Sequence, residues 1–385
     1  MKQSCYAIPC LSILLALLTF GCGNSPSDQP AKPVPASVEK MELKYATGFE
    51  VAYYDGYKIV RVTKPYMGAT EHFEYMVMQD GSSPTSTSTP KTVIKAPVKR
   101  LACTSTTHIP MLDYLKASEA LVGFPTTDYI SSEKTRKLVD QGHVAELGVD
   151  KELNLEKLVE IDPQMVMAYT VGGDYGQFKK IEQLGIPVVL NAEYLEEHPL
   201  GRAEWIKFMA AFLNKEAMAD SIFNVIEHNY QQYQQQAATV SNEPTVLSGV
   251  VYGDTWYMPG GKNYAARLID DAGGQYLWSQ DSTRGFLELS FEAVYEKAHQ
   301  ADYWIGVASF ESLAQLTEAD NRYGDFKAHQ QQQVYTNNWR KGAKGGSEFL
   351  ELGYLRPDII LADLIHILHP GLLPDHHLYF HQPLP

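Results

Sequence analysis

The sequence predicts an α/β protein made of two lobes with mainly parallel sheets, joined by a single long helix and preceded by a small β extension. Between Lys215 and about Val240, apolar residues recur at steps of one, three and four without an internal Pro or Gly, which indicates a long amphipathic helix. On both sides of this stretch, short apolar runs alternate with amphipathic helices, a pattern typical of parallel strands with crossover helices. Residues 41–79 instead carry alternating runs that indicate antiparallel strands.

The long helix is the element that joins the two predicted lobes. About 25 residues at roughly 1.5 Å each give a rod of nearly 40 Å, which is longer than one small domain is wide. Pro244 lies just beyond its end, where a helix stop is expected. An ordinary surface helix in one large domain remains the alternative, because periodicity alone does not distinguish the two.

The extension begins with a predicted hairpin. Phe49–Tyr54 and Tyr57–Val62 alternate apolar and polar residues around the pair Asp55-Gly56, the strongest short-range hairpin signal. His72–Met78 is a third predicted strand, and the Ser-, Thr- and Pro-rich run 81–90 is a predicted loop. We expect these strands to pack on the main body without a core of their own.

The remaining elements follow from short apolar runs and helical periodicity. The predicted strands are 99–104, 121–124, 165–169, 187–190, 245–252, 303–307 and 334–335. The predicted helices are 109–116, 154–161, 175–184, 264–272, 290–297 and 357–368. The predicted organisation is a signal peptide at 1–21, a flexible tether at 22–40, the β-rich extension and linker at 41–97, lobe one at 98–200, a bridging helical segment at 201–243, and lobe two with a C-terminal helix and tail at 244–385.

Composition bounds the function. A chain of 385 residues with 44% hydrophobic content is long and apolar enough for two real cores. Its net charge of −14 argues against binding nucleic acid and against electrostatic adhesion to anionic membranes.

The N-terminus predicts export to the cell envelope. A short cationic start is followed by an apolar run from Ile8 to Phe20, which is too short for a stable transmembrane helix and fits a secretory signal. Gly21-Cys22 resembles a lipobox, so Cys22 is the predicted lipidation site and the membrane is contacted through this anchor only. A plain cleaved signal is the alternative. Beyond Cys22 only Cys103 remains, which excludes an internal disulfide.

Several blocks astride the long helix resemble one known family. Lys99-Arg-Leu-Ala-Cys-Thr-Ser-Thr-Thr-His108 opens the first lobe, and Asn154 to Ala168 is similar to the family's "NLE…I…L.PDLV" block. Leu184-Gly-Ile-Pro-Val-Val189 and Leu268-Ile-Asp-Asp-Ala-Gly-Gly274 resemble its "LGIPV" and "AGG" motifs. Over about Val98 to Leu372, the chain resembles the periplasmic substrate-binding proteins of ABC importers for ferric siderophores, haem and cobalamin.

The resemblance implies two Rossmann-like lobes with a ligand cleft between them. It implies a monomer without catalytic residues, resident metal or cofactor, which captures an iron chelate (a ferric siderophore or haem) and delivers it to an ABC permease dimer in the inner membrane. Cobalamin is the alternative cargo within the family. The sequence likewise contains no G-x-S-x-G, H-E-x-x-H or glycine-rich phosphate loop.

The candidate cleft residues lie in loops after predicted strands, where open α/β sheets bind ligands. Aromatic side chains suit a flat or greasy chelate, and guanidinium groups suit an anionic one. The predicted contacts are His108, Tyr129, Tyr175, Trp256, Tyr257, Arg284, Trp339 and Arg340. Each aromatic residue has a core position as its alternative, the basic loop around Arg340 a solvated surface, and His108 a hydrogen-bonding role in its loop.

The resemblance also implies one acidic permease-docking residue on each lobe. By position these are Asp174 and Glu311, although the family's usual lobe-one Glu is replaced here by Tyr175 and Gly176. The histidines near the C-terminus lack the spacing of a metal site, so a surface tail is the interpretation for them. A free-metal binder, a surface hydrolase and a glycan-binding lipoprotein are the less favoured alternatives.

Overall fold

Lobe one is built on a five-stranded, all-parallel sheet. The computed structural model describes residues 39–79, 92–172 and 175–385, all within one compact unit of the chain. The strand order is β12–β11–β6–β7–β8, formed by Val188–Leu190, Met165–Ala168, Leu101–Cys103, Leu121–Phe124 and Ala145–Glu146. The lobe's helices are α1 (His108–Tyr114), α2 (Glu133–Asp140), α3 (Leu155–Ile161) and α4 (Gly176–Gln183).

Lobe two repeats this plan with one antiparallel edge. Its sheet has the order β16–β13–β18–β19–β20, formed by Gln275–Tyr276, Thr245–Ser248, Tyr303–Ile305, Val334–Thr336 and Gln382–Pro383. Only the β19–β20 pair is antiparallel. The helices are α8 (Tyr264–Asp271), α9 (Phe291–Ala298), α10 (Leu313–Ala319), α11 (Lys327–Gln330), α12 (Glu348–Leu352) and α13 (Pro357–Leu368). These two lobes confirm the predicted fold class.

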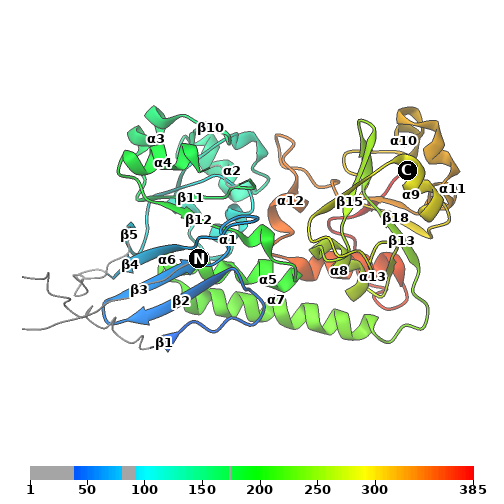
Figure 1. Ribbon diagram of the computed structural model, residues 1–385, viewed down its shortest axis with the longest axis horizontal. Coiled ribbons are helices and arrows are strands. Elements are labelled where there is room, and N and C mark those ends of the chain that lie inside the picture. The colour runs from blue at the N-terminus through cyan, green and yellow to red at the C-terminus, as the bar shows by residue number, and fades with distance from the viewer. Residues whose placement is uncertain (1–38, 80–91, 173–174) are drawn as a thin grey trace, which may run out of the picture. The chain divides into compact units, whose positions relative to one another are not determined.

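A single long helix connects the lobes, as the periodicity predicts. Helix α7 spans Glu216–Ala237, 22 residues, which corresponds to about 33 Å at 1.5 Å per residue. It packs on α5 (Pro199–Glu204) and α6 (Ile206–Leu213) beside lobe one and on α13 in lobe two (Figure 1). Every residue of α6 is buried, so this segment is a core helix between lobe one and the N-terminal sheet.

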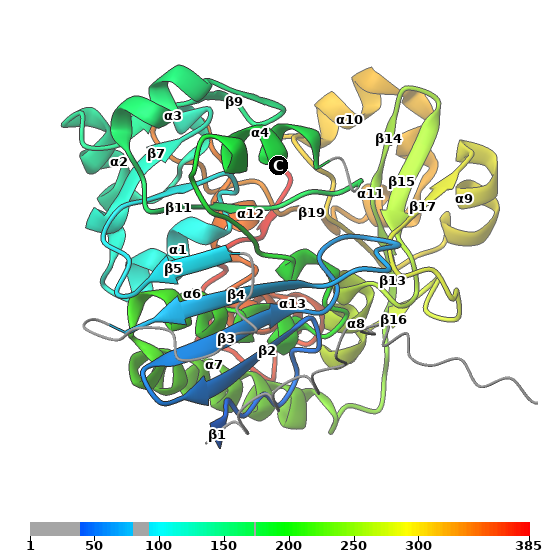
Figure 2. The same ribbon diagram turned by 60° about the vertical axis from the view of Figure 1, so that its left-hand side comes forward.

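The N-terminal sheet has five strands in sequence order. They are β1 (Glu39–Lys40), β2 (Phe49–Tyr54), β3 (Tyr57–Val62), β4 (Phe73–Met78) and β5 (Thr92–Lys95), antiparallel except for the β4–β5 pair (Figure 2). The ring of Phe49 lies 5.3 Å from that of Phe208 in α6. The hydroxyl of Tyr75 accepts a hydrogen bond from the backbone N–H of Leu190 at 3.0 Å, so this sheet also covers the outer edge of β12.

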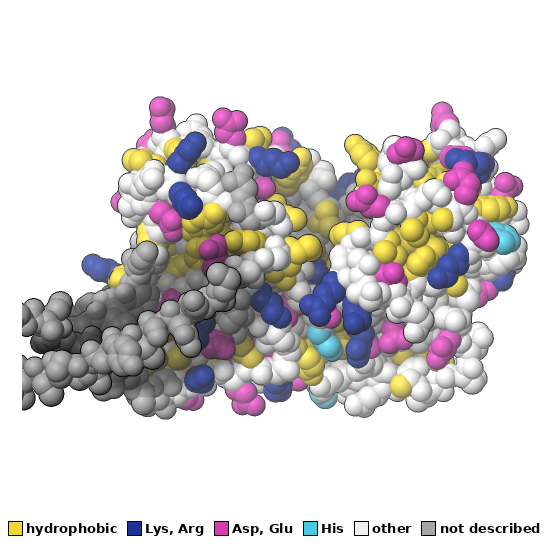
Figure 3. Space-filling model, in the orientation of Figure 1, with side chains coloured by type: hydrophobic (Ala, Val, Ile, Leu, Met, Phe, Trp, Pro, Cys, Tyr) yellow, Lys and Arg dark blue, Asp and Glu magenta, His cyan; other side chains and the backbone are white. Residues whose placement is uncertain are grey.

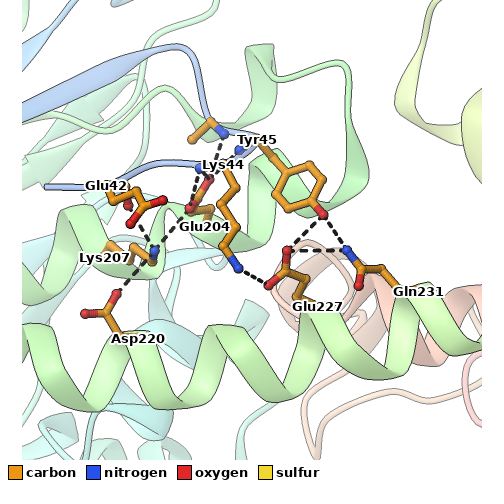
Figure 4. Close-up of polar contacts among 9 residues, drawn as sticks. Glu42, Lys44, Tyr45, Glu204, Lys207, Asp220, Glu227 and Gln231 are labelled. Atoms are coloured by element: carbon orange, nitrogen blue, oxygen red, sulfur yellow. Dashed lines mark hydrogen bonds and ion pairs between the residues drawn. The ribbon is translucent and has the colours of Figure 1, made fainter.

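Two buried carboxylates bind residues 44–48, the segment between β1 and β2. Glu204 accepts the backbone N–H groups of Lys44, Tyr45 and Ala46 at 2.8–3.1 Å, and it pairs with Lys207 (Figure 4). Glu196 accepts those of Thr47 and Gly48 at 2.8 Å.

A third carboxylate comes from α7. Glu227 accepts hydrogen bonds from the Lys44 ammonium group and from the Tyr45 hydroxyl (Figure 4). Hydrogen bonds to ionised acceptors are about twice as strong as neutral ones, so the three carboxylates fix the sheet to lobe one and to the connecting helix.

Lobe two contains strands and helices that the sequence prediction lacks, such as β15 (Thr255–Pro259), β17 (Phe286–Leu289) and α10, and two predicted features differ in the structure. The predicted strand 245–252 is broken at Gly249, which has a φ of +87°, and it continues as β14 (Val250–Tyr252) in a separate sheet. The predicted surface tail is wrong: Phe380, His381 and Leu384 are buried. The carboxylate of Asp363 accepts the backbone N–H groups of residues 379–381, and this long-range contact folds the tail onto α13.

Within the described part of the chain, none of the helices combines the length and the apolar character needed to cross a membrane.

Candidate ligand-binding site

The two lobes meet through a segment of lobe two that reaches lobe one. In Figure 1, helix α12 lies between the lobes, and it packs on α1. The buried carboxylate of Glu351 on α12 accepts the backbone N–H groups of Ser131 and Ser132 at 2.7 and 2.8 Å. Gly346 lies against the backbone of Tyr129, where a Cβ would be 2.0 Å from the carbonyl oxygen. The loops that follow β7 and β19 are therefore in contact, as a site between the lobes requires.

Lobe two has an exposed aromatic face. Beyond β13, the strands β14 (Val250–Tyr252), β15 (Thr255–Pro259) and β17 (Phe286–Leu289) form an antiparallel sheet. In the register of this sheet, Tyr257 lies opposite Val250 on β14 and Glu288 on β17. Tyr252 is two residues from Val250, and Phe286 is two residues from Glu288, so both side chains lie on the same face as Tyr257. Tyr252, Tyr257 and Phe286 are 81%, 39% and 66% exposed. Figure 3 shows hydrophobic side chains on the border of lobe two with the hollow between the lobes.

The other face of the same sheet is lobe core. Trp256 has no exposed surface, stacks on Trp304 with ring centroids 5.4 Å apart, and donates its indole N–H to the carbonyl of Ser248. The predicted cleft role of Trp256 is therefore wrong, because strand alternation points it inward while its neighbour Tyr257 points outward.

The carboxyl ends of β6 and β12 in lobe one carry polar residues. The hydroxyl of Thr107 bonds that of Ser105 and donates to the carboxylate of Glu193, the first residue after the β12 loop. Burial raises the pKa of Glu193 to about 7, against the lowering effects of Thr107 and Arg202. Its second oxygen, Oε2, has no hydrogen-bond partner among the described residues. This end of lobe one therefore holds a carboxyl group that changes charge near neutral pH.

His108 is also a core residue and not an accessible contact. Its side chain has 0% exposure, and neither ring nitrogen has a hydrogen-bond partner among the residues the structure describes. Burial lowers the pKa of His108 to about 3, so the ring is neutral at physiological pH. The predicted ligand contact of His108 is therefore wrong, because the ring, in the first turn of α1, points into the core of lobe one.

Tyr175 is covered by the N-terminal sheet. Its ring lies 5.2 Å from that of Phe73 in β4 and 5.5 Å from that of Phe178, and its hydroxyl donates to Glu182. The aromatic character that favours a cleft role here serves packing against the extension.

The predicted cations already have carboxylate partners. Arg340 pairs with Glu348 at 2.8 Å and lies over the ring of Tyr379, while Arg284 pairs with Glu197 at 2.9 Å. Trp339 and Tyr129 are exposed, on the two loops that the Tyr129–Gly346 contact brings together.

Other hollows in the surface lie away from these strand ends. One of about 910 Å³ is bordered by Phe73, Val93 and Pro187, and one of about 690 Å³ by Met41, Lys207 and Asp220. Both lie beside the N-terminal sheet. Across residues 39–79, 92–172 and 175–385, no three His, Cys, Asp or Glu side chains gather as metal ligands would.

Comparison with known proteins decides the family. The model of a family described as periplasmic binding protein matches residues 101–338. The chain belongs to this family. Periplasmic binding proteins of this kind deliver small solutes to ABC permeases, and the two lobes described above are their fold.

The relatives of this periplasmic binding protein include an uncharacterized lipoprotein of Methanocaldococcus jannaschii. The two are 27% identical over 399 residues, which covers 94% of this chain and 92% of the relative. This relative therefore also spans the N-terminal sheet, which the family model does not reach. Its description as a lipoprotein and the family itself both indicate the cell envelope.

Solved structures share the fold at low identity. A haem-binding protein of Vibrio cholerae gives a TM-score of 0.54 at 17% identity, covering 68% of this chain and 98% of its own. A molybdate-binding protein of Haemophilus influenzae gives 0.54 at 17%, covering 74% and 90%.

Of the predicted docking and lipidation residues, only Glu311 is among the residues that the structure describes. Glu311 follows β18 and precedes α10, is exposed, and pairs with Lys341 at 2.8 Å. Asp174 and Cys22 lie outside the described residues.

Sequence reasoning missed Tyr252 and Phe286. Gly253-Asp254 between two apolar runs is a hairpin signal, and Phe286-Leu-Glu-Leu289 alternates. Together these two patterns carry the information from which this aromatic face follows.

Proposed function

We propose that this protein is the solute-binding component of an ABC importer and that its cargo is an iron chelate, either a ferric siderophore or haem. The observation that carries the proposal is the exposed aromatic face of Tyr252, Tyr257 and Phe286. Its strand β17 begins two residues after Arg284, which pairs with Glu197 of lobe one. Rigid aromatic rings give a flat, partly apolar ligand a large contact area at a low entropic cost.

The charge of the cleft loops gives less support than the sequence predicts. Arg340, Arg284 and Lys341 are each paired with a carboxylate, so an anionic cargo has to compete for them. Cobalamin is consequently the second candidate, because its corrin ring suits the same aromatic face. Free zinc or manganese would need several His and carboxylate ligands instead.

The envelope arrangement is part of the same proposal. The chain acts as a monomer, is held to the membrane by a lipid on Cys22, and docks on a permease dimer in the inner membrane through Glu311 and Asp174. Charge reversal in Glu311→Arg should lower transport by the reconstituted importer while leaving cargo affinity unchanged. Loss of affinity instead would place Glu311 in the binding site.

The cargo is tested by titration of the chain that begins at Gly23, which contains the whole described unit. Haemin, a ferric tris-catecholate, a ferric hydroxamate, cobalamin, molybdate, zinc and manganese are added separately, and melting temperature and tryptophan fluorescence are followed. A ligand at 100 times its dissociation constant adds about 2.7 kcal/mol to stability. We expect a saturable response to one iron chelate.

The aromatic face is tested with the double variant Tyr257→Ala/Phe286→Ala. Fully burying one such side chain contributes about 1.5–3 kcal/mol. Because the cargo covers each ring only in part, affinity should fall roughly 10- to 100-fold when both are removed, and the melting temperature of the free protein is recorded alongside. Val225→Ala on the exposed side of α7 is the control. A response to free metal ions alone, or full affinity in the double variant, would contradict the proposal.

A further inference from the structure

The loop between β3 and β4, residues 63–72, belongs to the N-terminal sheet and precedes the segment that matches the family. It begins at Thr63, whose backbone N–H and hydroxyl donate to the carbonyls of Gly48 and Thr47 at 2.8 and 3.1 Å. Those two residues are held in turn by the buried carboxylate of Glu196. The first residue of the loop is thus fixed to the segment that follows β12.

The middle of the loop lies at the carboxyl ends of β11 and β12. The backbone of Met67 lies near the hydroxyl of Tyr194, shortly after β12. This hydroxyl donates to the carbonyl of Thr170, just after β11, at 2.6 Å. Beyond the loop, Phe73 packs on Tyr175, which also follows β11. The loop therefore crosses the edge of lobe one at which an open α/β sheet binds its ligand.

Lobe two reaches the same place. Arg284, two residues before β17, pairs with Glu197, the neighbour of Glu196. In Figure 2 the loop extends from the N-terminal sheet toward the elements of lobe two. Loop 63–72 and the loop before the aromatic strand Phe286–Leu289 therefore both lie beside one short segment, residues 194–197.

The side chain of Met67 is uncovered. It is 62% exposed, next to Gly68 with a φ of +77°. A thioether side chain is flexible and polarizable and adapts to irregular apolar or aromatic surfaces. Because the loop is anchored at Thr63, less conformational entropy of its backbone is lost on binding.

We propose that loop 63–72 forms a third side of the cargo cleft, in addition to the two lobes, and that Met67 contacts the apolar part of the bound chelate. This inference rests on the proposed function and deepens it. The N-terminal sheet then contributes to the choice of cargo, and an iron chelate with an extended apolar or aromatic periphery is favoured over a compact, fully polar one.

The test compares two exposed apolar positions with nearly equal exposure. Met67→Glu places a charge in the proposed third side, and Val225→Glu places one on α7, where 61% of the Val225 side chain is exposed. Both variants are titrated with haemin and with the ferric tris-catecholate, and both are melted without ligand. We expect Met67→Glu to weaken the chelate that the unsubstituted chain binds by 5- to 20-fold, with no effect of Val225→Glu and unchanged melting temperatures.

A second readout reports contact directly. In the chain from Gly23 the only cysteine is Cys103, which is buried, so Met67→Cys and Val225→Cys can each be labelled with an environment-sensitive fluorophore. The emission at position 67, but not at 225, should shift on addition of the chelate, with the same dissociation constant as the tryptophan signal of the same labelled protein. This dissociation constant should be higher than that of the unsubstituted chain, because the label at position 67 weakens binding as Met67→Glu does.

The outcomes separate this inference from the proposed function. If Tyr257→Ala/Phe286→Ala weakens the chelate while Met67→Glu binds normally and the label at 67 is silent, the third side does not exist and the function stands. If the unsubstituted chain binds none of the iron chelates, both the function and this inference are overturned.

Discussion

The two lobes share one plan but present different chemistry at their facing edges. Lobe one ends in polar groups, Ser105, Thr107 and Glu193, and is fixed to the N-terminal sheet by buried carboxylates. Lobe two ends in the aromatic face of Tyr252, Tyr257 and Phe286.

The links between the lobes also differ from those within lobe one. Besides α7 and the contacts of α12, the links include the exposed Arg284–Glu197 pair and a hydrogen bond from Arg356 to the hydroxyl of Tyr114. Arg202 of α5 also lies over the rings of Tyr264 and Tyr354 in lobe two. We infer that lobe one and the N-terminal sheet behave as one rigid, polar wall, against which lobe two brings an apolar surface.

The largest expected effect is a loss of stability when the attachment of the N-terminal sheet to lobe one is removed. In Glu204→Ala, three backbone N–H groups and Lys207 lose a fully buried carboxylate. Breaking a buried charged contact of this kind costs about 3–5 kcal/mol. The free energy of unfolding, measured in urea, should fall by that amount.

The matched control is Asp220→Ala, which removes an exposed partner of the same Lys207. Exposed ion pairs contribute about 0–1 kcal/mol. If both variants lose the same small amount of stability, the sheet is not fixed by Glu204.

The next effect is the pH dependence of stability that Glu193, one of the polar groups of lobe one, contributes. Because the pKa of Glu193 is raised from 4.5 to about 7 in the folded chain, folding favours its protonated form. This contribution is fully present below pH 4.5 and is lost as the pH rises through 7. In Glu193→Gln the loss is absent, so the variant should gain about 3 kcal/mol over the unsubstituted chain between pH 4.5 and 8.

This measurement compares urea unfolding of the two proteins at several pH values. Glu351, whose pKa burial also raises to about 7, and His108, whose pKa is lowered, affect both proteins equally. A difference between the proteins that does not change with pH would show that Glu193 is ionised throughout.

The smallest effect concerns the link between the lobes. Arg284→Ala removes an ion pair whose side chains are 69% and 44% exposed, so stability should change by less than about 1 kcal/mol. Cargo affinity should change less than threefold, because the pair borders the cleft without forming its aromatic face. A tenfold loss in titration would instead make Arg284 a cargo contact.

Much of the fold could be predicted because its signals are local. The apolar period of α7, the Asp55-Gly56 hairpin and the buried parallel strands of lobe one are each visible within one stretch of sequence. The site was harder to predict because burial depends on contacts distant in sequence. Strand alternation separates Trp256 from Tyr257, but which face is covered depends on Trp304, and Tyr175 is covered by Phe73 from the extension.

The same reason explains the tail. Its histidines give a polar sequence, yet Asp363 bonds His376 and His381 and three successive backbone N–H groups. Nothing near residues 376–381 in the sequence indicates that partner.

The central claim is tested most directly by determining the structure of the chain with the tightest-binding chelate. We predict that the chelate lies between the lobes, stacked on Tyr257 and Phe286, with polar groups toward Thr107 and Ser105. A chelate bound elsewhere, with this aromatic face left in solvent, would contradict the account.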